Sequence, residues 1–475
     1  MSNEQAFSRI KAQLDAHSQS HLLAFWDALE PEKQRDLCTQ IEKLDFEQLD
    51  QRIQDFVIHD HSAKIPTNFT PASAYPETPE TPEMAQKYAK ATALGEDLLR
   101  AGQVGAFVVA GGQGTRLGFS GPKGNYPISP IKHKTLFELF AESILATSQK
   151  FNARCPWYIM TSPLNHEQTR NTLRANDYFG LPEEDVFVFQ QGTWPNFSMN
   201  GQIFLADQDA LATSPDGHGG SLKALYESHA VDHMRERGVE TLSYWQVDNP
   251  LINIFDPLFI GLHVLDKSQM SSKALIKTGP MEKVGNFCRV NDKVTVVEYS
   301  DLPDEEAKRK NPDGSLVFEL GSIGIHLVSR SFVEELNAGE FSLPIHRAVK
   351  KIPHITPQGD RITPDTPNGI KLETFVFDAL PLASHSMILR THRHEEFGPV
   401  KNATGVDSAE TSRQMIIDRA AAWLESAGIE VPRTQSGQVD CCLEIAPSFA
   451  LTPGDLKARL DQIPEIKPGD SVYLG

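Results

Sequence analysis

The sequence predicts an α/β protein whose central domain contains a mixed, mainly parallel sheet. Short β-rich runs at 105–110, 157–161, 186–191 and 241–247 are separated by helical patterns, of which 134–150 and 219–238 are the clearest. Strands that alternate with helices in this way form a mainly parallel sheet with helices on both faces. A length of 475 residues is enough for roughly two to four domains.

An N-terminal helical region is expected over 1–100. Apolar residues recur there at three- and four-residue spacing, as at Phe7, Ile10 and Leu14, which is the pattern of amphipathic helices. The proline-rich stretch 65–83 then predicts an extended connector, because proline fixes φ and removes a backbone donor. A further helix is expected over 87–101.

The central domain is expected over 101–405 and a small C-terminal domain over 406–475. Within the first, the runs 274–279, 285–290 and 293–300 are separated by turn residues, which predicts a β-rich antiparallel insertion. The C-terminal part begins with an amphipathic helix over 412–428.

Composition excludes several classes of protein. With 45 basic and 63 acidic residues the formal charge is −18, which argues against general binding to nucleic acid. No apolar stretch is long enough to span a bilayer, and the N-terminus lacks the pattern of a signal peptide. The five cysteines form no CxxC pair, so we expect reduced thiols and a cytoplasmic location.

Residues 108–128, VVAGGQGTRLGFSGPKGNYPI, place a glycine-rich loop directly after the first strand of the central domain. Gly112, Gly114 and Gly118 have the wrong spacing for G-x-G-x-x-G, and Lys123 does not follow a glycine as a Walker A lysine does. The glycines allow the backbone to approach an anion closely, and Arg116 and Lys123 supply positive charge. A triphosphate therefore fits this loop, the alternative being a mobile surface turn.

The loop, AGGQGTRLG followed by PKG, resembles the signature of the UDP-sugar pyrophosphorylases, most closely the UDP-N-acetylglucosamine pyrophosphorylases. Similar blocks follow in that family's order: FQQGTWP (189–195), SPDGHGGSLKAL (214–225), VDNPLINIFDPLFIG (247–261), EKVGNFCRV with VVEYSD (282–301), PNGIKLETFVFD (367–378) and FGPVKN (397–402). The resemblance implies a Rossmann-like, GT-A-type nucleotidyltransferase domain. It also implies that UTP and a sugar 1-phosphate are converted to a UDP-sugar and pyrophosphate.

The resemblance assigns roles to individual residues. The expected catalytic residues are Arg116 and Lys123. The expected nucleotide-binding residues are Ala110, Gly111, Gly112, Gln113, Gly114, Gln191, Gly217, His218 and Asp248. The expected sugar- or phosphate-binding residues are Glu319, Ser322, Lys371 and Lys401. Without the surrounding blocks, each of the last two lysines would be read as an ordinary solvated side chain.

Asp248 is also the expected ligand of a Mg²⁺ cofactor. It follows the buried run 242–247, at the carboxyl end of a strand, where open α/β sheets bind ligands. Mg²⁺ prefers oxygen ligands and is held by one or two carboxylates together with phosphates and water. Asp378 is a candidate second carboxylate. The alternative for Asp248 is a cap of the turn that follows the strand.

Two departures concern the sugar. The family members specific for N-acetylglucosamine have asparagine at the position of His218, where the UDP-glucose pyrophosphorylases have histidine. They also have asparagines at the positions of Glu319 and Ser322. N-acetylglucosamine 1-phosphate is the expected substrate, and glucose 1-phosphate or a broad range of sugar phosphates is the alternative. An alternative of another class is an inactive protein that binds UDP-sugars.

Two segments, HDH at 59–61 and HRHEE at 392–396, contain several imidazole and carboxylate groups, which are ligands of transition metals. The first lies beside the connector, and the second alternates as a strand would. Neither has the fixed tetrahedral ligand pattern of a zinc site, so metal binding is not expected at either segment.

Overall fold

The structure is a computed structural model that describes residues 3–61, 68–339 and 341–475. By their contacts, Met1–Lys64, Gly192–Gly220 and Ser342–Asp378 form one unit, and Ile65–Gln191, Ser221–Phe341 and Ala379–Gly475 form a second. These units do not coincide with the expected ranges 1–100, 101–405 and 406–475, which stay predictions. Residues 65–67 of the expected connector lie outside the described residues. Among the described helices, none combines the length and hydropathy of a membrane span.

Unit 1 packs the N-terminal helices against three small β-sheets. The helices are α1 (Asn3–Ala16), α2 (Pro31–Glu42) and α3 (Phe46–Arg52), with a π-helical turn over Ile53–Ile58. The sheets are β15 (His346–Lys350), β18 (Gly369–Glu373) and β6 (Phe197–Ser198); β17 (Arg361–Ile362), β16 (His354–Ile355), β7 (Leu205–Asp207) and β8 (Ala210–Leu211); and β5 (Thr193–Pro195) with β9 (Thr213–Pro215). Leu14, Ile41 and Ile370 are buried in their common core, so the predicted amphipathic helices are confirmed.

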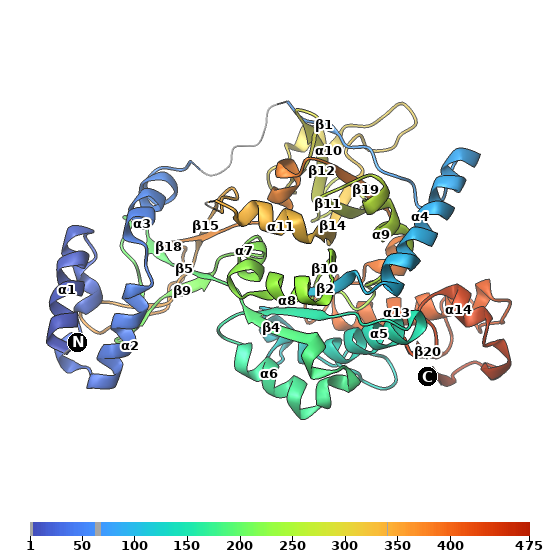
Figure 1. The fold of residues 1–475 in the computed structure, drawn as a ribbon, viewed down its shortest axis with the longest axis horizontal. Helices are drawn as coiled ribbons and strands as arrows, with labels where there is room; N and C mark the ends of the chain where they lie inside the picture. Colours follow the sequence, from blue (N-terminus) through green and yellow to red (C-terminus); the bar gives the residue numbers. More distant parts are fainter. Residues whose placement is uncertain (1–2, 62–67, 340) are drawn as a thin grey trace. The chain divides into compact units, whose positions relative to one another are not determined.

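Unit 2 is built on a ten-stranded sheet whose longest path is β1-β12-β14-β10-β2-β3-β4. Its strands are β1 (Thr70–Pro71), β2 (Val104–Val109), β3 (Trp157–Thr161), β4 (Val186–Gln190), β10 (Thr241–Gln246), β11 (Met270–Ile276), β12 (Gly285–Val290), β13 (Lys293–Val297), β14 (Leu320–Ser329) and β19 (Ser386–Arg390). Strands β10, β2, β3 and β4 are parallel neighbours, with β10 beside β2 in the middle of the sheet (Figure 1). The predicted mixed sheet is confirmed. Its other half is antiparallel around β14, which pairs with β10, β11 and β12.

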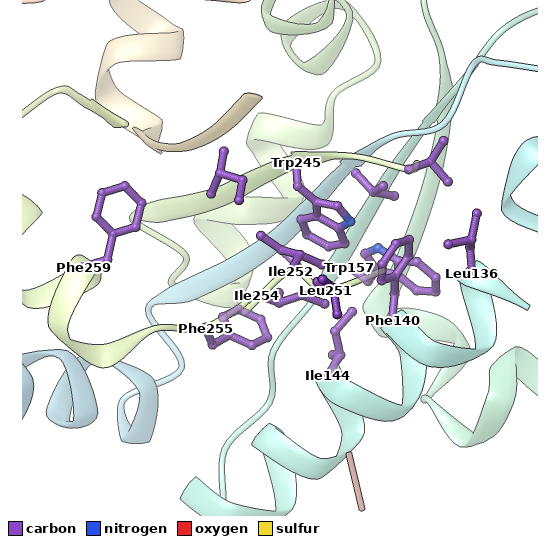
Figure 2. Packing of buried hydrophobic residues seen from close by; sticks show 14 of the residues in the cluster. Leu136, Phe140, Ile144, Trp157, Trp245, Leu251, Ile252, Ile254, Phe255 and Phe259 are labelled. Atoms are coloured by element: carbon purple, nitrogen blue, oxygen red, sulfur yellow. The ribbon is translucent and has the colours of Figure 1, made fainter. Parts of the chain in front are cut away.

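The helices of unit 2 are α4 (Pro82–Arg100), α5 (Leu136–Phe151), α6 (His166–Ala175), α7 (Gly220–Glu227), α8 (Ala230–Arg237), α9 (Pro257–Leu265), α10 (Asp304–Lys308), α11 (Arg330–Asn337), α12 (Arg393–Glu396), α13 (Ala409–Ser426) and α14 (Pro453–Lys457). Helix α5 begins where the Thr135 side chain accepts a hydrogen bond from the Glu138 N–H. It packs Phe140 and Ile144 against Trp157 and Trp245 on one face of the sheet (Figure 2). The C-terminal part adds the parallel pair β20 (Cys442–Ile445) and β21 (Ser471–Leu474).

Two local predictions are wrong. The single helix expected over 219–238 is two helices, because His229 adopts φ +63° between α7 and α8, a left-handed conformation that a helix cannot include. The segment 392–396 is not a strand: β19 ends at Arg390 and α12 follows. Its side chains have partners in different directions, since Arg393 contacts Glu282 whereas Glu396 is buried against Lys273.

Candidate functional site

The glycine-rich loop is anchored to the sheet at its first residues. The Ala110 N–H donates to the Met160 carbonyl at 2.7 Å, which continues the parallel pairing of β2 with β3. The buried Asn165 side chain then donates to the carbonyl oxygens of Ala110 at 2.9 Å and Gly112 at 3.3 Å. Both carbonyls are therefore turned towards Asn165. The N–H groups of Gly111, Gly112 and Gln113 have no partner among the described residues.

The remainder of the loop folds back on itself. The Gly114 N–H donates to the Gly121 carbonyl at 2.9 Å and the Lys123 N–H to the Gly112 carbonyl at 3.0 Å. The loop also contains two short 3₁₀ turns, Thr115–Leu117 and Lys123–Asn125. The loop is thus closed on itself by backbone hydrogen bonds.

Close packing requires glycine at two positions of the loop, Gly111 and Gly124. At a third position, Gly112, no described atom outside its chain neighbours excludes a side chain. A Cβ on Gly111 would lie 2.4 Å from the side-chain oxygen of Gln191, and one on Gly124 would lie 2.1 Å from the Phe137 ring. Gln191, a predicted nucleotide-binding residue, therefore lies against the loop. A Cβ on Gly112 would meet no atom within 4 Å, so the open side of the loop faces free space at this point.

Four predicted site residues of unit 2 form one charged cluster. Burial lowers the pKa of Lys123; the carboxylate of Asp248 opposes this shift, and the nearby cations Lys401 and Arg116 add to it. The Lys123 Nζ donates to the carbonyl oxygen of Val400 at 3.2 Å, and the Val400 N–H donates to the carbonyl of Asp248 at 2.8 Å. Lys123 thus lies within electrostatic range of two further cations and one carboxylate, which leaves an excess of positive charge.

Asp248 is buried just beyond the end of β10. Its carboxylate oxygens have no hydrogen-bond or ion-pair partner in the part of the chain that the structure describes. The neighbouring Asn249, which the sequence analysis did not single out, donates to the Glu396 carbonyl at 2.7 Å and accepts from the Gly398 N–H at 3.2 Å. Asn249 thus holds the segment 396–398 next to Asp248. In the sequence, its position beside Asp248 in VDNP was the only feature that could have indicated this positioning role.

Glu319 and Ser322 lie around the start of β14. The Lys277 N–H donates to the Glu319 carbonyl at 2.9 Å, and Ser322 lies opposite Ala274 of β11 and Gly285 of β12. Both Glu319 and Ser322 are partly exposed. A Cβ on Gly285 would lie 2.5 Å from a methyl carbon of Val296, so close packing requires glycine opposite the serine.

The predicted site residues of unit 1 form a second group. Gly217 has φ +88°, and a Cβ there would lie 2.2 Å from the Thr374 carbonyl, so only glycine fits. The His218 Nδ1 accepts a hydrogen bond from the Val376 N–H at 3.0 Å, and its ring stacks on Phe375 with centroids 5.2 Å apart. Burial lowers the pKa of His218 to about 4. Its imidazole is therefore neutral at pH 7 and carries its proton on Nε2.

Two further predicted residues of unit 1 have ionic partners. The Lys371 Nζ lies 3.0 Å from Glu373 Oε2 on β18, and Asp378 Oδ2 lies 2.7 Å from the His346 Nε2. In residues 3–61, 68–339 and 341–475 no group of three or more histidine, cysteine, aspartate or glutamate side chains is placed to hold a metal ion. The histidine-rich segments 59–61 and 392–396 lie within these described residues. Any Mg²⁺ at Asp248 would need oxygen ligands from the substrate.

Comparisons with known proteins extend along almost the whole chain. The family model described as UTP–glucose-1-phosphate uridylyltransferase matches residues 75–474. A protein of Xenopus tropicalis named UDP-N-acetylhexosamine pyrophosphorylase-like protein 1 is 34% identical over 90% of this chain and 86% of its own length. The UDP-N-acetylglucosamine pyrophosphorylase of Saccharomyces cerevisiae is 38% identical over 70% and 72%. The crystal structure of the corresponding Trypanosoma brucei enzyme, with an inhibitor, covers 100% of this chain and 98% of its own with a TM-score of 0.81 and 25% identity.

Proposed function

Because the chain belongs to the UTP–glucose-1-phosphate uridylyltransferase family, we propose that it makes UDP-N-acetylglucosamine and pyrophosphate from UTP and N-acetyl-α-D-glucosamine 1-phosphate. An oxygen of the sugar phosphate attacks the α-phosphorus of UTP in line. The bond to the β-phosphate oxygen breaks, and pyrophosphate leaves with its electron pair. Both reactants are anions, so holding them together and stabilising charge are the main tasks of the protein.

The observation that carries this proposal is the excess of positive charge beside the unpaired N–H groups of the glycine-rich loop. Lys123 interacts electrostatically with two further cations, Arg116 and Lys401, and with one carboxylate, that of Asp248. Three successive N–H groups, those of residues 111–113, are available on the same loop as Lys123. Backbone N–H groups and cations together form the kind of site that holds a polyphosphate. We assign Lys123 and Arg116 to the charge that develops on pyrophosphate, and Lys401 and Lys371 to substrate phosphates.

Uridine recognition is assigned to neutral hydrogen-bonding groups. Gln191, which packs against Gly111, has a side-chain amide that can both donate to and accept from a uracil edge. In unit 1, Gly217 and His218 are assigned to nucleotide binding, His218 as a donor through its Nε2–H. A neutral imidazole adds no charge to this part of the site.

The residues at the end of β10 fit a Mg²⁺ cofactor. The buried carboxylate of Asp248 has no protein partner among the described residues and offers the hard oxygen ligands that Mg²⁺ prefers. When bound, the ion would neutralise phosphate charge. The carboxylate of Asp378, the candidate second ligand, already contacts His346.

The identity of the sugar has two candidates. The names of the relatives from Saccharomyces cerevisiae and Trypanosoma brucei support N-acetylglucosamine 1-phosphate. Glucose 1-phosphate is supported by the family description and by His218, Glu319 and Ser322, which stand where relatives specific for N-acetylglucosamine are expected to have asparagine.

The test measures the release of pyrophosphate from UTP in the presence of Mg²⁺, with each of the two sugar 1-phosphates in turn. The expected result is release that depends on added sugar phosphate and is faster with N-acetylglucosamine 1-phosphate. A faster rate with glucose 1-phosphate would select the alternative. Saturable binding of a UDP-sugar without any release would instead identify an inactive binding protein.

We also propose a cytoplasmic location. The five cysteines all lie in described segments of the chain and are free thiols, which a reducing compartment favours. Fractionation of cells that produce the tagged protein would test this.

A further inference from the structure

Asn165 is a buried residue at the start of α6 whose side chain does not cap that helix. Asparagine at this position ordinarily accepts a hydrogen bond from the first N–H groups of the helix, and Asn165 forms none. Its side-chain oxygen instead accepts from the Ser162 N–H at 2.9 Å and from the Ser162 hydroxyl at 3.2 Å. Its nitrogen donates to the carbonyl oxygens of Ala110 and Gly112. Both donors and both acceptor positions of the amide are therefore used outside the helix.

The orientation of this amide follows from its partners. A backbone N–H can only donate and a carbonyl oxygen can only accept, so the oxygen of Asn165 faces Ser162 and its nitrogen faces the loop. Ser162 comes directly after β3 and is itself buried, so it holds the amide at the carboxyl end of that strand. The amide is thus a fixed donor to two carbonyls of the glycine-rich loop.

These two hydrogen bonds set the direction of two N–H groups of the loop. No peptide bond in the described part of the chain is cis, and in a trans peptide group the N–H points opposite to the carbonyl. The Ala110 carbonyl shares a peptide group with the Gly111 N–H, and the Gly112 carbonyl shares one with the Gln113 N–H. Because both carbonyls point towards Asn165, both N–H groups point away from it. Neither has a partner among the described residues, so both are available to an anion on that side.

The same contacts fix the position of Lys123 relative to these N–H groups. The Gly112 carbonyl accepts from the Lys123 N–H at 3.0 Å as well as from Asn165, as the two lone pairs of a carbonyl allow. Asn165 therefore holds the point at which the chain returns from Lys123 to the start of the loop. Without the amide of Asn165, the two carbonyls could turn towards an anion, and their partial negative charge would repel it.

We infer that Asn165 is a positioning residue that makes the glycine-rich loop competent to bind the polyphosphate of UTP. It acts without touching the nucleotide, by keeping the N–H groups of Gly111 and Gln113 directed at the phosphates and the carbonyls directed away. This inference rests on the proposed function. Because the amide acts only on groups that meet phosphate, its removal should weaken binding of the phosphates and leave binding of the nucleoside unchanged.

The first test compares Asn165→Ala with the wild type by binding, which needs no turnover. With Mg²⁺ and no sugar phosphate, the affinity for UTP is measured by calorimetry and the affinity for uridine by NMR titration. The affinity of Asn165→Ala for UTP should be about 10- to 100-fold lower than that of the wild type, whereas its affinity for uridine should stay within about twofold. Equal losses for both ligands, or no loss for UTP, would overturn the inference. The result decides the role of Asn165 even if the wild type binds UTP and releases no pyrophosphate.

The second test uses the complete reaction and a matched control. The KM of Asn165→Ala for UTP should rise about 10- to 100-fold, while the KM for the sugar 1-phosphate stays within about twofold. A merely structural role would change both alike. Asn176→Ala is the control, since Asn176 lies exposed at the other end of α6 and its side chain donates to a carbonyl of that helix, that of Thr172, at 2.8 Å. It should match the wild type.

A milder variant keeps the inference testable if Asn165→Ala does not fold. Serine is favourable at the start of a helix, and the hydroxyl introduced by Asn165→Ser can donate to at most one of the two carbonyls. This variant is expected to lose at least about threefold in affinity for UTP, again with unchanged affinity for uridine. Wild-type affinity of Asn165→Ser for UTP contradicts the inference.

Discussion

Replacement of Lys123 by methionine should abolish most of the activity without destabilising the protein. The Lys123 side chain is partly buried, and its ammonium group donates a hydrogen bond to one backbone carbonyl, that of Val400, at 3.2 Å. Burial, Lys401 and Arg116 all lower the pKa of Lys123, so the protein holds this charge at a cost in stability. A charge held in that way is expected where it serves substrate rather than folding.

The expected loss of activity follows from the charge on the reacting phosphates. Removing one preorganised group that stabilises a developing charge typically lowers kcat by about 10²- to 10³-fold, or about 2.7–4 kcal/mol. We expect a decrease of this size for Lys123→Met in the release of pyrophosphate from UTP. The exposed Lys90, on α4, provides the matched control, since Lys90→Met removes the same charge far along the chain from the cluster. Activity of Lys123→Met within about threefold of wild type would refute the assignment.

The stability of the same variant gives an independent check with a defined sign. The pKa of Lys123 is lowered in the native state from its ordinary value of 10.5, so the unfolded chain binds this proton more tightly. The free energy of unfolding of the wild type therefore increases as pH rises from the lowered pKa towards 10.5. Below the lowered pKa, the full cost of keeping Lys123 protonated in the folded protein is present. Lys123→Met lacks that penalty, so at pH 7 its free energy of unfolding should equal or exceed that of wild type. The difference should shrink by about pH 10.5 in urea titrations. A loss above about 1 kcal/mol at pH 7 would contradict this.

Three more predictions concern the loop, the metal and His218. Gly112→Ala should leave the melting temperature unchanged, since its Cβ meets nothing within 4 Å, yet raise the KM for UTP at least about tenfold; an unchanged KM would place the triphosphate elsewhere. Asp248→Asn should raise the Mg²⁺ concentration needed for half-maximal rate at least about tenfold, and chelation by EDTA should stop the wild-type reaction. The imidazole of His218, with a pKa of about 4, should show no NMR titration between pH 5.5 and 9, and its contribution to stability should fall as pH drops from 6.5 towards 4.

The elements that the sequence predicts best are those defined by local patterns. The runs that became β2, β3, β4 and β10 are continuous apolar stretches, and their alternation with helices fixes their parallel pairing. The antiparallel surroundings of β14 were not predictable in detail, because the residues that pair with it on β10, β11 and β12 all lie more than 30 residues earlier in the sequence. The break at His229 was missed since a left-handed residue leaves the apolar spacing of the flanking helices intact.

The candidate site shows the same division between local and distant information. Arg116, Lys123 and the glycines could be proposed from one loop, because their residue types alone indicate an anion. Lys401 could be proposed only through the resemblance of FGPVKN, since nothing local distinguishes it from a surface lysine.

The way in which the cluster is assembled explains why its side chains remain available to substrate. Two segments distant in sequence, 248–249 and 396–400, meet without the carboxylate of Asp248: the Val400 N–H donates to the Asp248 carbonyl, and the Asn249 side-chain amide joins the Glu396 carbonyl to the Gly398 N–H. Since these contacts position the segments without using the carboxylate of Asp248, that carboxylate is left for a metal. The glycine-rich loop is held in a similar way. The Asn165 side chain donates to the carbonyl oxygens of Ala110 and Gly112, and the N–H groups of residues 111–113 have no partner among the described residues. Mutations in Asn249 should therefore reduce activity by displacing Asp248 and Lys401 together.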